Sequence, residues 1–319
     1  MVMKREIKSH FKTLQTALDA IFPPRATVVG IESIDGGDIN RAYELELKTG
    51  EHIFMKSNSR MDEDFFIAEA MGLCAIESTG TVKTPAILCT GTDPAWADDP
   101  FSFLVLEYIH SAKPRDDYWE TFGHELAAMH LADTKEVMEV DLDGGNLSGG
   151  RFGFFQDNFI GERPQKNTRT DSWISFFRDK RLSPQFRDAD GYFSSRDRTL
   201  ITRLLDHLDE FLIEPKQASL LHGDLWSGNV MCGPEGKAMM IDPAVYVGHA
   251  EVDIAMTELF GGFPERFYAA YNEVNSLEPE YKTRRDIYNL YQLLNHLNLF
   301  GPGYLGSVLS IVRKYEEEI

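Results

Sequence analysis

The chain has few of the features that are typical of secreted disulfide-rich proteins, zinc-binding proteins or membrane-spanning proteins. Its 319 residues include only three cysteines, Cys74, Cys89 and Cys232, which form an odd set without metal-ligand spacing. This excludes a disulfide framework and a zinc site, and it predicts reduced thiols. Residues 1–10 hold no apolar signal segment, and no run approaches the roughly 18 to 20 apolar residues of a membrane span. We therefore expect a cytoplasmic protein.

Positive charge is also scarce. The chain carries 32 Lys and Arg residues against 51 Asp and Glu residues, which gives a formal net charge of −19. This balance argues against nucleic acid or an anionic membrane as the main partner, and it is compatible with a cationic acceptor. An anionic nucleotide would have to be met by a local Lys and by metal ions. The 43% of hydrophobic residues suffice for one large or two ordinary globular domains, and the composition does not predict an oligomeric state.

The most informative stretch lies between positions 220 and 244. Two apolar residues precede His222-Gly223-Asp224-Leu225-Trp226-Ser227-Gly228-Asn229, and a second apolar run ends in Asp242. This is the pattern of a kinase catalytic loop, in which the first Asp receives the acceptor's proton while the Asn and a later Asp ligate magnesium. We assign Asp224 as the base, and Asn229 and Asp242 as Mg²⁺ ligands. The alternative is a set of ordinary turn residues, which the joint spacing disfavours.

The N-terminal region is predicted to form a helix followed by a small antiparallel sheet. Apolar residues recur at helical spacing from position 7 to position 21 and stop at two prolines. Alternating apolar residues and glycine turns predict strands at residues 28–34, 41–47 and 52–56. This arrangement is typical of the nucleotide-binding lobe of a kinase.

Lys56 stands at the end of the third predicted strand. In a kinase the Lys of this strand reaches the α- and β-phosphates of ATP and is oriented by a Glu on the next helix. A helix is expected from residue 62 to about 78, with Glu69 on its inward apolar face. Since a buried carboxylate is costly without a partner, we predict a Lys56–Glu69 ion pair. The alternative is a solvated Lys and a surface Glu.

Two further segments are candidates for nucleotide contacts. Gly36 and Gly37 lie between the first two strands, where main-chain N–H groups could approach phosphate, although they lack G-x-G-x-x-G spacing and also fit a plain hairpin turn. The strand at 101–109 is the last before the predicted domain boundary near His110. Its final residues could bind the adenine edge through their main chain; these are Glu107, Tyr108 and Ile109.

The predicted domains are residues 1–109, a nucleotide-binding lobe with the hinge at its end, and residues 110–319, a mainly helical catalytic and acceptor-binding lobe. Residues 144–171 form a segment too long for a plain connector, and such segments are usually functional. Its candidate acceptor contacts are Phe154, Asn158, Gln165 and Asn167.

Three residues near the predicted loop or in the C-terminal helices are also singled out. Asp253 follows the catalytic stretch and is expected either to cap a helix or to brace the loop. Trp226 is a candidate for packing on the substrate, although a Trp is more often a core residue. His296 is a candidate substrate contact, although a single His on an apolar helix is more often a satisfied core residue.

Taken together, these motifs resemble the fructosamine kinase (ketosamine 3-kinase) family, within the aminoglycoside-phosphotransferase-like kinases. The resemblance runs along nearly the whole chain. His-Gly-Asp followed by Asn is shared by many small-molecule kinases, whereas two runs look specific to this family. They are Leu225-Trp226-Ser227-Gly228 and Leu293-Leu294-Asn295-His296-Leu297-Asn298-Leu299-Phe300.

The resemblance implies an α+β, two-lobed protein-kinase-like fold, with a small antiparallel β lobe and a larger mainly helical lobe. It also implies ATP- and Mg²⁺-dependent phosphorylation of the sugar 3-hydroxyl of a ketosamine, the adduct of a sugar with an amine or with a lysine of a protein. One departure is Arg169, where a Trp is expected, so the sugar or amine preference could differ. The alternatives are a kinase of another acceptor, such as an aminoglycoside or choline, and a nucleotide-binding scaffold without turnover.

Overall fold

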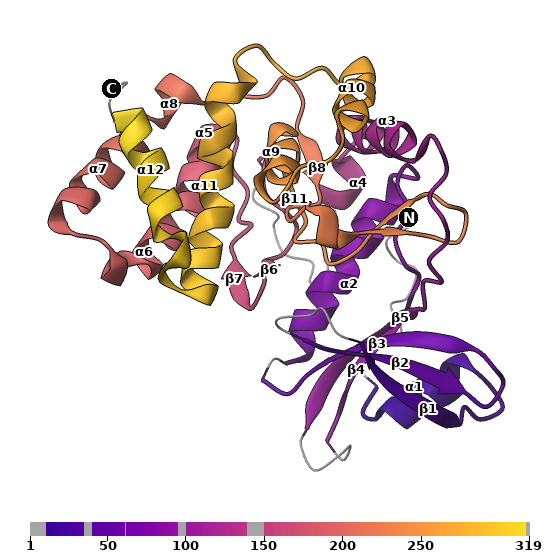
Figure 1. Ribbon diagram of the computed structural model, residues 1–319. Helices are drawn as coiled ribbons and strands as arrows, with labels where there is room; N and C mark the ends of the chain where they lie inside the picture. Colours follow the sequence, from indigo (N-terminus) through magenta and orange to yellow (C-terminus); the bar gives the residue numbers. More distant parts are fainter. Residues whose placement is uncertain (1–10, 35–39, 61, 95–99, 139–149, 317–319) are drawn as a thin grey trace. The chain divides into compact units, whose positions relative to one another are not determined.

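The computed structural model describes residues 11–34, 40–60, 62–94, 100–138 and 150–316. Gly36 and Gly37, the candidate phosphate-contacting glycines, lie outside the described residues. The chain divides into two compact units (Figure 1). The first contains the residues up to Tyr118 together with Val230–Pro243, and the second contains Trp119–Asn229 and Ala244–Ile319.

The first unit is built on a five-stranded antiparallel sheet with the strand order β1-β2-β3-β5-β4. Its strands are β1 (Val28–Ile34), β2 (Arg41–Leu47), β3 (His52–Asn58), β4 (Ile87–Asp93) and β5 (Phe101–Glu107), and its helices are α1 (Leu14–Ile21) and α2 (Glu63–Ser78). Apolar residues of α1 and of one sheet face form a buried cluster that includes Leu18, Met55 and Val105. Because side chains alternate along a strand, Lys56 points to the other face, the face opposite Met55.

The first helix is shorter than its sequence pattern predicts. Phe11 forms a β-bridge with Gly91, and its carbonyl accepts from the Thr92 amide at 2.9 Å. The helix begins only at Leu14, where the Thr13 side chain accepts from the amide of Thr16. Phe11 therefore contributes to the sheet, because pairing with a strand edge satisfies its main chain as well as a helical turn would.

The domain boundary also differs from the position expected near residue 110. Residues 230–243 return to the first unit as the hairpin of β9 (Val230–Cys232) and β10 (Ala238–Met240). The Met240 amide donates to the Lys83 carbonyl at 2.9 Å, and Arg115 donates through its amide to Gly236. A boundary drawn along the chain cannot show this return, because these contacts join residues more than a hundred positions apart.

The second unit is mainly helical, with two short antiparallel strand pairs, β6 with β7 and β8 with β11, among the helices (Figure 1). Its strands are β6 (Asn158–Ile160), β7 (Arg163–Gln165), β8 (Ser219–Leu221) and β11 (Tyr246–Gly248). Its helices are α3 (Tyr118–Leu131), α4 (Lys135–Met138), α5 (Trp173–Phe176), α6 (Ser183–Asp188), α7 (Ser195–Asp206), α8 (Leu208–Phe211), α9 (Glu251–Leu259), α10 (Glu265–Val274), α11 (Tyr281–Phe300) and α12 (Leu305–Glu316), with a π-helical turn at Phe177–Leu182 between α5 and α6.

A buried ion pair joins α9 to α11. The Arg284 guanidinium donates from Nε and Nη2 to the two carboxylate oxygens of Glu251, both at 2.7 Å. Both residues are almost fully buried, at 2% and 1% exposed. Such a pair is stabilising only while both partners are present, because removal of one leaves an uncompensated charge in the core.

We predict that Arg284→Met lowers the free energy of unfolding by about 3–5 kcal/mol, the usual cost of breaking a buried pair. Arg285, which pairs with Glu258 and Asp286 at the half-exposed side of the same helix, supplies the control. Arg285→Met should cost no more than about 1 kcal/mol. Urea denaturation of both variants measures the difference, and equal losses would contradict the assignment.

His249 lies between β11 and α9, with its ring packed against Trp173 and Tyr288. Burial, followed by the positive charge of Arg284, lowers the pKa of His249 from 6.5 to about 3. The imidazole is therefore neutral in the folded protein at neutral pH.

This depressed pKa predicts a loss of stability in acid. Between pH 6.5 and 3 the unfolded chain binds a proton on His249 that the folded chain does not, so the free energy of unfolding falls as the pH falls. The contribution is about 2 kcal/mol between pH 6.5 and 5. We expect His249→Gln to have a correspondingly shallower pH dependence in urea denaturation. Parallel curves for the two proteins would refute this.

Candidate active site

The predicted catalytic loop leaves β8 in the second unit and is anchored to the chain that enters β11. Leu221 pairs with Tyr246, and the Ala244 amide donates to the His222 carbonyl at 2.9 Å. Gly223 has φ +81°, and a Cβ at this position would lie 2.1 Å from the Ala244 carbonyl oxygen. Only glycine fits this close approach, which explains the Gly of the His-Gly-Asp motif.

Asp253 on α9 braces this loop. Its carboxylate accepts from the main-chain amides of His222 at 2.7 Å and Gly223 at 2.9 Å, and it contacts His130 Nε2 at 3.2 Å. Asp253, His222 and His130 are fully buried. The other ring nitrogen of His130, Nδ1, is hydrogen-bonded to the Tyr271 hydroxyl at 2.7 Å. Of the two expected roles, the structure shows the brace, since α9 has no side-chain N-cap.

Asp224 and Asn229 lie together at the loop. Asn229 Nδ2 donates to the Asp224 carbonyl at 2.8 Å and to Asp224 Oδ2 at 3.2 Å, and the Asn229 amide donates to the Trp226 carbonyl at 3.0 Å. Asp224 is half-buried. Both side-chain bonds of Asn229 use the donor end of the amide, so they do not occupy Oδ1, the atom that can ligate a cation.

Lys56, Glu69 and Asp242 meet in the first unit. The Lys56 ammonium donates to Glu69 Oε1 at 2.7 Å and also to Asp242 Oδ1. Burial lowers the pKa of Lys56, but the charges of Asp242 and Glu69 more than offset it, so the net pKa is raised. The ammonium is therefore permanently charged. The predicted Lys56–Glu69 pair is present, and Asp242 is its third member.

Asp242 follows β10 with a left-handed backbone, φ +57°. This conformation is uncommon outside glycine, although Asp tolerates it better than most residues. It turns the chain sharply after the buried Met240, and the Asp242 side chain remains 44% exposed. The strained turn thus presents a carboxylate that contacts Lys56 yet is open to a further ligand. The candidate residues are divided between the units, with Asp224 and Asn229 in the second.

The expected hinge begins at Glu107, the last residue of β5, and continues with Tyr108 and Ile109, and all three residues are half-buried. The Glu107 amide donates to the Ala86 carbonyl at 2.9 Å, and β5 ends here, two residues earlier than predicted. The Tyr108 ring packs against His52 and His110, with centroid separations of 6.0 and 4.9 Å. The binding of adenine by the main chain of these three hinge residues stays a prediction.

Asn158 and Asn167, predicted as acceptor contacts, are buried and bonded to the protein. Asn158 Nδ2 donates to the Val245 carbonyl at 2.7 Å, and its Oδ1 accepts from Asn167 and Gln165, both at 2.8 Å. Gln165 also donates to the Ala244 carbonyl at 3.0 Å. This network therefore holds the segment that follows Asp242.

Arg181 is a member of this network that the sequence patterns do not reveal. It is fully buried, donates to the Lys166 carbonyl and to Asn167 Oδ1, both at 2.7 Å, and stacks over the Tyr246 ring at 3.9 Å. Its two Nη groups thus donate to carbonyl oxygens, and the Tyr246 ring faces its charge, whereas its Nε is buried without a hydrogen-bond partner in the described part of the chain. The sequence gives no signal for its burial, because Arg181 ends a run of four charged residues, Arg178-Asp179-Lys180-Arg181, which is typical of a solvent-exposed helix face.

Trp226 and His296 lie closer to the surface than core residues would. Trp226 is 38% exposed, and its ring covers Gly228 so closely that a Cβ there would lie 2.4 Å from the indole. His296 is half-buried, with Nδ1 at 2.9 Å from the Gln292 carbonyl. Both are therefore available to a ligand in part, and their substrate role stays a prediction.

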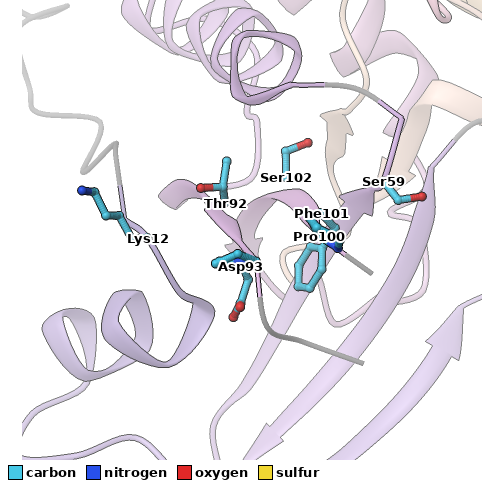
Figure 2. Close-up of a pocket in the computed structure, with 8 residues that line it drawn as sticks. Lys12, Ser59, Thr92, Asp93, Pro100, Phe101 and Ser102 are labelled. Carbon is cyan, nitrogen blue, oxygen red and sulfur yellow. The ribbon is translucent and has the colours of Figure 1, made fainter. Parts of the chain in front are cut away.

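Each unit has a cavity. In the first unit, a cavity of 450 Å³ lies where α1 begins and is lined by Lys12, Thr92 and Asp93, among others (Figure 2). It lies at the Phe101 end of β5, away from the Glu107 end. In the second unit, a cavity of 180 Å³ is lined by residues 154–157 and 167–169. Arg169, the residue that departs from the expected Trp, is part of its wall.

No helix among the described residues is long and apolar enough to cross a membrane. In the same part of the chain, no group of three or more His, Cys, Asp or Glu side chains could hold a metal ion by itself. The oxygen donors of Asn229 and Asp242 nevertheless suit Mg²⁺, which is usually held by one or two protein groups together with phosphate oxygens and water.

The Asp253 brace leads to a prediction on the folded protein. Asp253→Asn keeps one acceptor oxygen but loses the charge that strengthens two buried N–H bonds. We expect a loss of about 1–3 kcal/mol in unfolding free energy. We also expect faster hydrogen exchange at the His222 and Gly223 amides. Asp209→Asn, at an exposed position of α8, is the control, and unchanged exchange at both loop amides would contradict the brace.

Comparison with known proteins identifies the family. The profile of the fructosamine kinase family matches residues 10–318. A protein named as a probable ketoamine kinase of Synechocystis is 39% identical over 275 residues, which are 85% of each chain. The chloroplastic protein-ribulosamine 3-kinase of Arabidopsis thaliana is 37% identical over 293 residues, 90% of this chain and 83% of the relative.

The fold agrees with these matches. A solved structure of a candidate fructosamine-3-kinase from Haemophilus somnus superposes with a TM-score of 0.80 at 26% identity, covering 95% of this chain and 96% of the other. This confirms the α+β, protein-kinase-like fold, with an antiparallel sheet in one unit and mainly helices in the other. The loop, the lysine pair and the matched profile lead to one conclusion: the chain belongs to the fructosamine kinase family.

Proposed function

We propose that the chain transfers the γ-phosphoryl group of ATP to the 3-hydroxyl of a ketosamine. The observation that carries the proposal is the pair of polar clusters, Asp224 with Asn229 and Lys56 with Glu69 and Asp242. Together they supply a base, metal ligands and a fixed cation, which are the parts that phosphoryl transfer needs. Two relatives of this chain are named as a ketoamine kinase and a protein-ribulosamine 3-kinase, which supports the choice of acceptor.

Asp224 is the catalytic base in this proposal. Its carboxylate orients the acceptor hydroxyl and takes its proton while the new oxygen–phosphorus bond forms and the bond to ADP breaks. The Nδ2 group of Asn229 and the braced main chain hold Asp224 in place. Because the brace fixes the start of the loop at His222 and Gly223, part of the ordering cost is met during folding rather than at the moment of reaction.

Lys56 holds the phosphates, and Glu69 holds Lys56. The ammonium remains charged at every relevant pH, because the pKa of Lys56 is raised by its two carboxylate neighbours. Asn229 and Asp242 would hold magnesium, which when bound neutralises phosphate charge. For Asp242 this requires sharing its exposed carboxylate between Lys56 and the cation.

The remaining nucleotide contacts are assigned from the places of the residues along the chain. The main chain of Glu107, Tyr108 and Ile109 is proposed to bind adenine, and Gly36 and Gly37 to approach the phosphates. The acceptor is proposed to contact Trp226 and His296, while Asn158 and Asn167 act by holding the chain next to the site.

We place the protein in the cytoplasm, where ATP is available and its three cysteines would stay reduced.

ADP release with four acceptors tests the function. Fructose-lysine and ribulose-lysine should be phosphorylated, whereas an aminoglycoside and choline should give only the background rate. Turnover with an aminoglycoside or choline alone would replace the proposed acceptor class. No turnover with any of the four, together with normal ATP binding, would favour a non-catalytic nucleotide-binding protein.

Substitution of the base gives a sharper test. Asp224→Asn keeps the shape and one hydrogen-bonding oxygen but cannot accept the proton, so we expect kcat to fall by about 10²- to 10⁴-fold. ATP affinity, measured by calorimetry, should change less than about twofold, since only the chemical step is affected. Lys56→Met should instead weaken ATP binding. The exposed Asp209→Asn is the matched control, and an Asp224→Asn enzyme of normal kcat would exclude the assigned base.

A further inference from the structure

The peptide group directly before the proposed base is held by a side chain from α11. Gln292 Nε2 donates to the Gly223 carbonyl at 2.8 Å. This carbonyl belongs to the peptide bond that links Gly223 to Asp224. The amide of the same peptide group, on Asp224, donates to His222 Nδ1 at 3.3 Å. The shorter bond, from Gln292, is therefore the stronger of the two contacts that hold this group.

The peptide groups on either side have other partners. The amides of His222 and Gly223 donate to Asp253, and the Asp224 carbonyl accepts from Asn229. Asp253 thus holds the chain before the Gly223–Asp224 peptide, and Asn229 holds the chain after it. Neither of them bonds to that peptide itself, so its orientation depends on other groups.

This peptide group lies at the point of the loop that rotates most easily. A peptide group is planar, so it turns as a unit about the bonds to the Cα atoms of Gly223 and Asp224. Gly223 has φ +81°, and without a Cβ it restricts this rotation less than any other residue would. Rotation of the group changes the direction in which the Asp224 side chain leaves the main chain. The bond from Gln292 opposes the rotation, because the carbonyl would lose its donor.

Gln292 is firmly held in its own helix. It is 1% exposed, and it lies within residues 287–295 of α11, all of which are buried. The Glu251–Arg284 ion pair ties α11 to α9, the helix that carries Asp253. The two side chains that hold the start of the loop therefore come from helices that are joined to each other.

Packing alone does not explain a glutamine at this position. The bond to Gly223 is the only hydrogen bond of the Gln292 side chain among the described residues, and its Oε1 is buried without a partner there. A buried polar atom without a partner lowers stability, and an apolar side chain of the same length would avoid this loss. Residues that break a rule of stable packing are typical of functional sites.

We propose that Gln292 is a positioning residue for phosphoryl transfer, which directs the Asp224 carboxylate by holding the Gly223 carbonyl. This inference rests on the proposed function and adds to it a residue that acts through the loop rather than on a substrate. A base must be aligned with the hydroxyl from which it takes a proton. Loss of the bond should therefore slow the transfer step without weakening the binding of either substrate.

Gln292→Met tests the role, because it keeps the length of the side chain and removes the donor. With ATP and fructose-lysine we expect kcat, from ADP release, to fall by about 10- to 100-fold, the usual effect of a small misalignment. The KM of each substrate should change less than about twofold. The melting temperature should change little, since loss of the unpaired Oε1 offsets the partner that the Gly223 carbonyl loses. Hydrogen exchange at the Asp224 amide should be faster, and this readout does not require turnover.

Gln292→Glu is the rescue variant. The protonated carboxyl has the shape of the amide and can donate its O–H to the Gly223 carbonyl, whereas the ionised form has no donor. Burial and the nearby carboxylates of Asp224 and Asp253 favour the protonated form, so we expect the change between the forms to fall between about pH 6 and pH 9. Relative to the unmodified protein, kcat should therefore recover as the pH falls. Gln292→Met should show no such recovery.

Asn289→Leu is the matched control. Asn289 is also a buried amide of α11, and its Oδ1 also has no partner among the described residues, but the side chain makes no hydrogen bond to the described loop. Its replacement removes a buried polar group from the same helix without touching the Gly223 carbonyl. We expect kcat to stay within about twofold of the unmodified value at every pH.

The outcomes separate the two proposals. A normal kcat per folded molecule in Gln292→Met, or a Gln292→Glu protein that is as slow as Gln292→Met at every pH, would overturn the positioning role while the kinase assignment stands. An unmodified protein that releases no ADP with fructose-lysine or ribulose-lysine would overturn the ketosamine kinase assignment, and the role of Gln292 in the transfer with it.

Discussion

The structure depends most on how one buried carboxylate fixes the catalytic loop. Asp253 accepts two main-chain N–H bonds, from His222 and Gly223, in a site with no exposed surface. A charge in such a place is tolerated only when donors surround it, and His130 adds one more contact. Because the two carboxylate oxygens of Asp253 are fixed, the main chain that they hold, which carries Asp224, is fixed as well. The reactive side chain stays half-buried while its support is completely buried.

The same principle governs the first unit, with the signs of the charges reversed. There a buried cation, Lys56, is held by two carboxylates, one of which is on a strained turn. Asp242 is also partly exposed, so it can serve the lysine and a metal ion. Each unit thus orders its own polar cluster with ion pairs and N–H bonds that form on folding.

Sequence reasoning was most reliable where the local pattern and the tertiary environment agree. The strands β1 and β2 have the predicted limits, and the helix α2 begins one residue after its predicted start and ends at Ser78 as predicted, because alternation and helical periodicity there reflect real burial. It was less reliable where long-range pairing competes with local preference, as at Phe11, which joins a strand edge. Asn158 and Asn167 were singled out as polar residues in a long segment, but only the structure shows that the protein itself satisfies them.

The sequence by itself determined the family, the Lys56–Glu69 pair and the identity of the proposed base, because each depends on residue type at a set spacing along the chain. Only the tertiary structure decided that Asp253 braces the loop, that Asp242 belongs with Lys56, and that the buried Arg181 stacks over Tyr246. These relations join residues separated by up to 186 positions. Spacing along the chain carries no information about such contacts, since they are set by how the helices and strands pack.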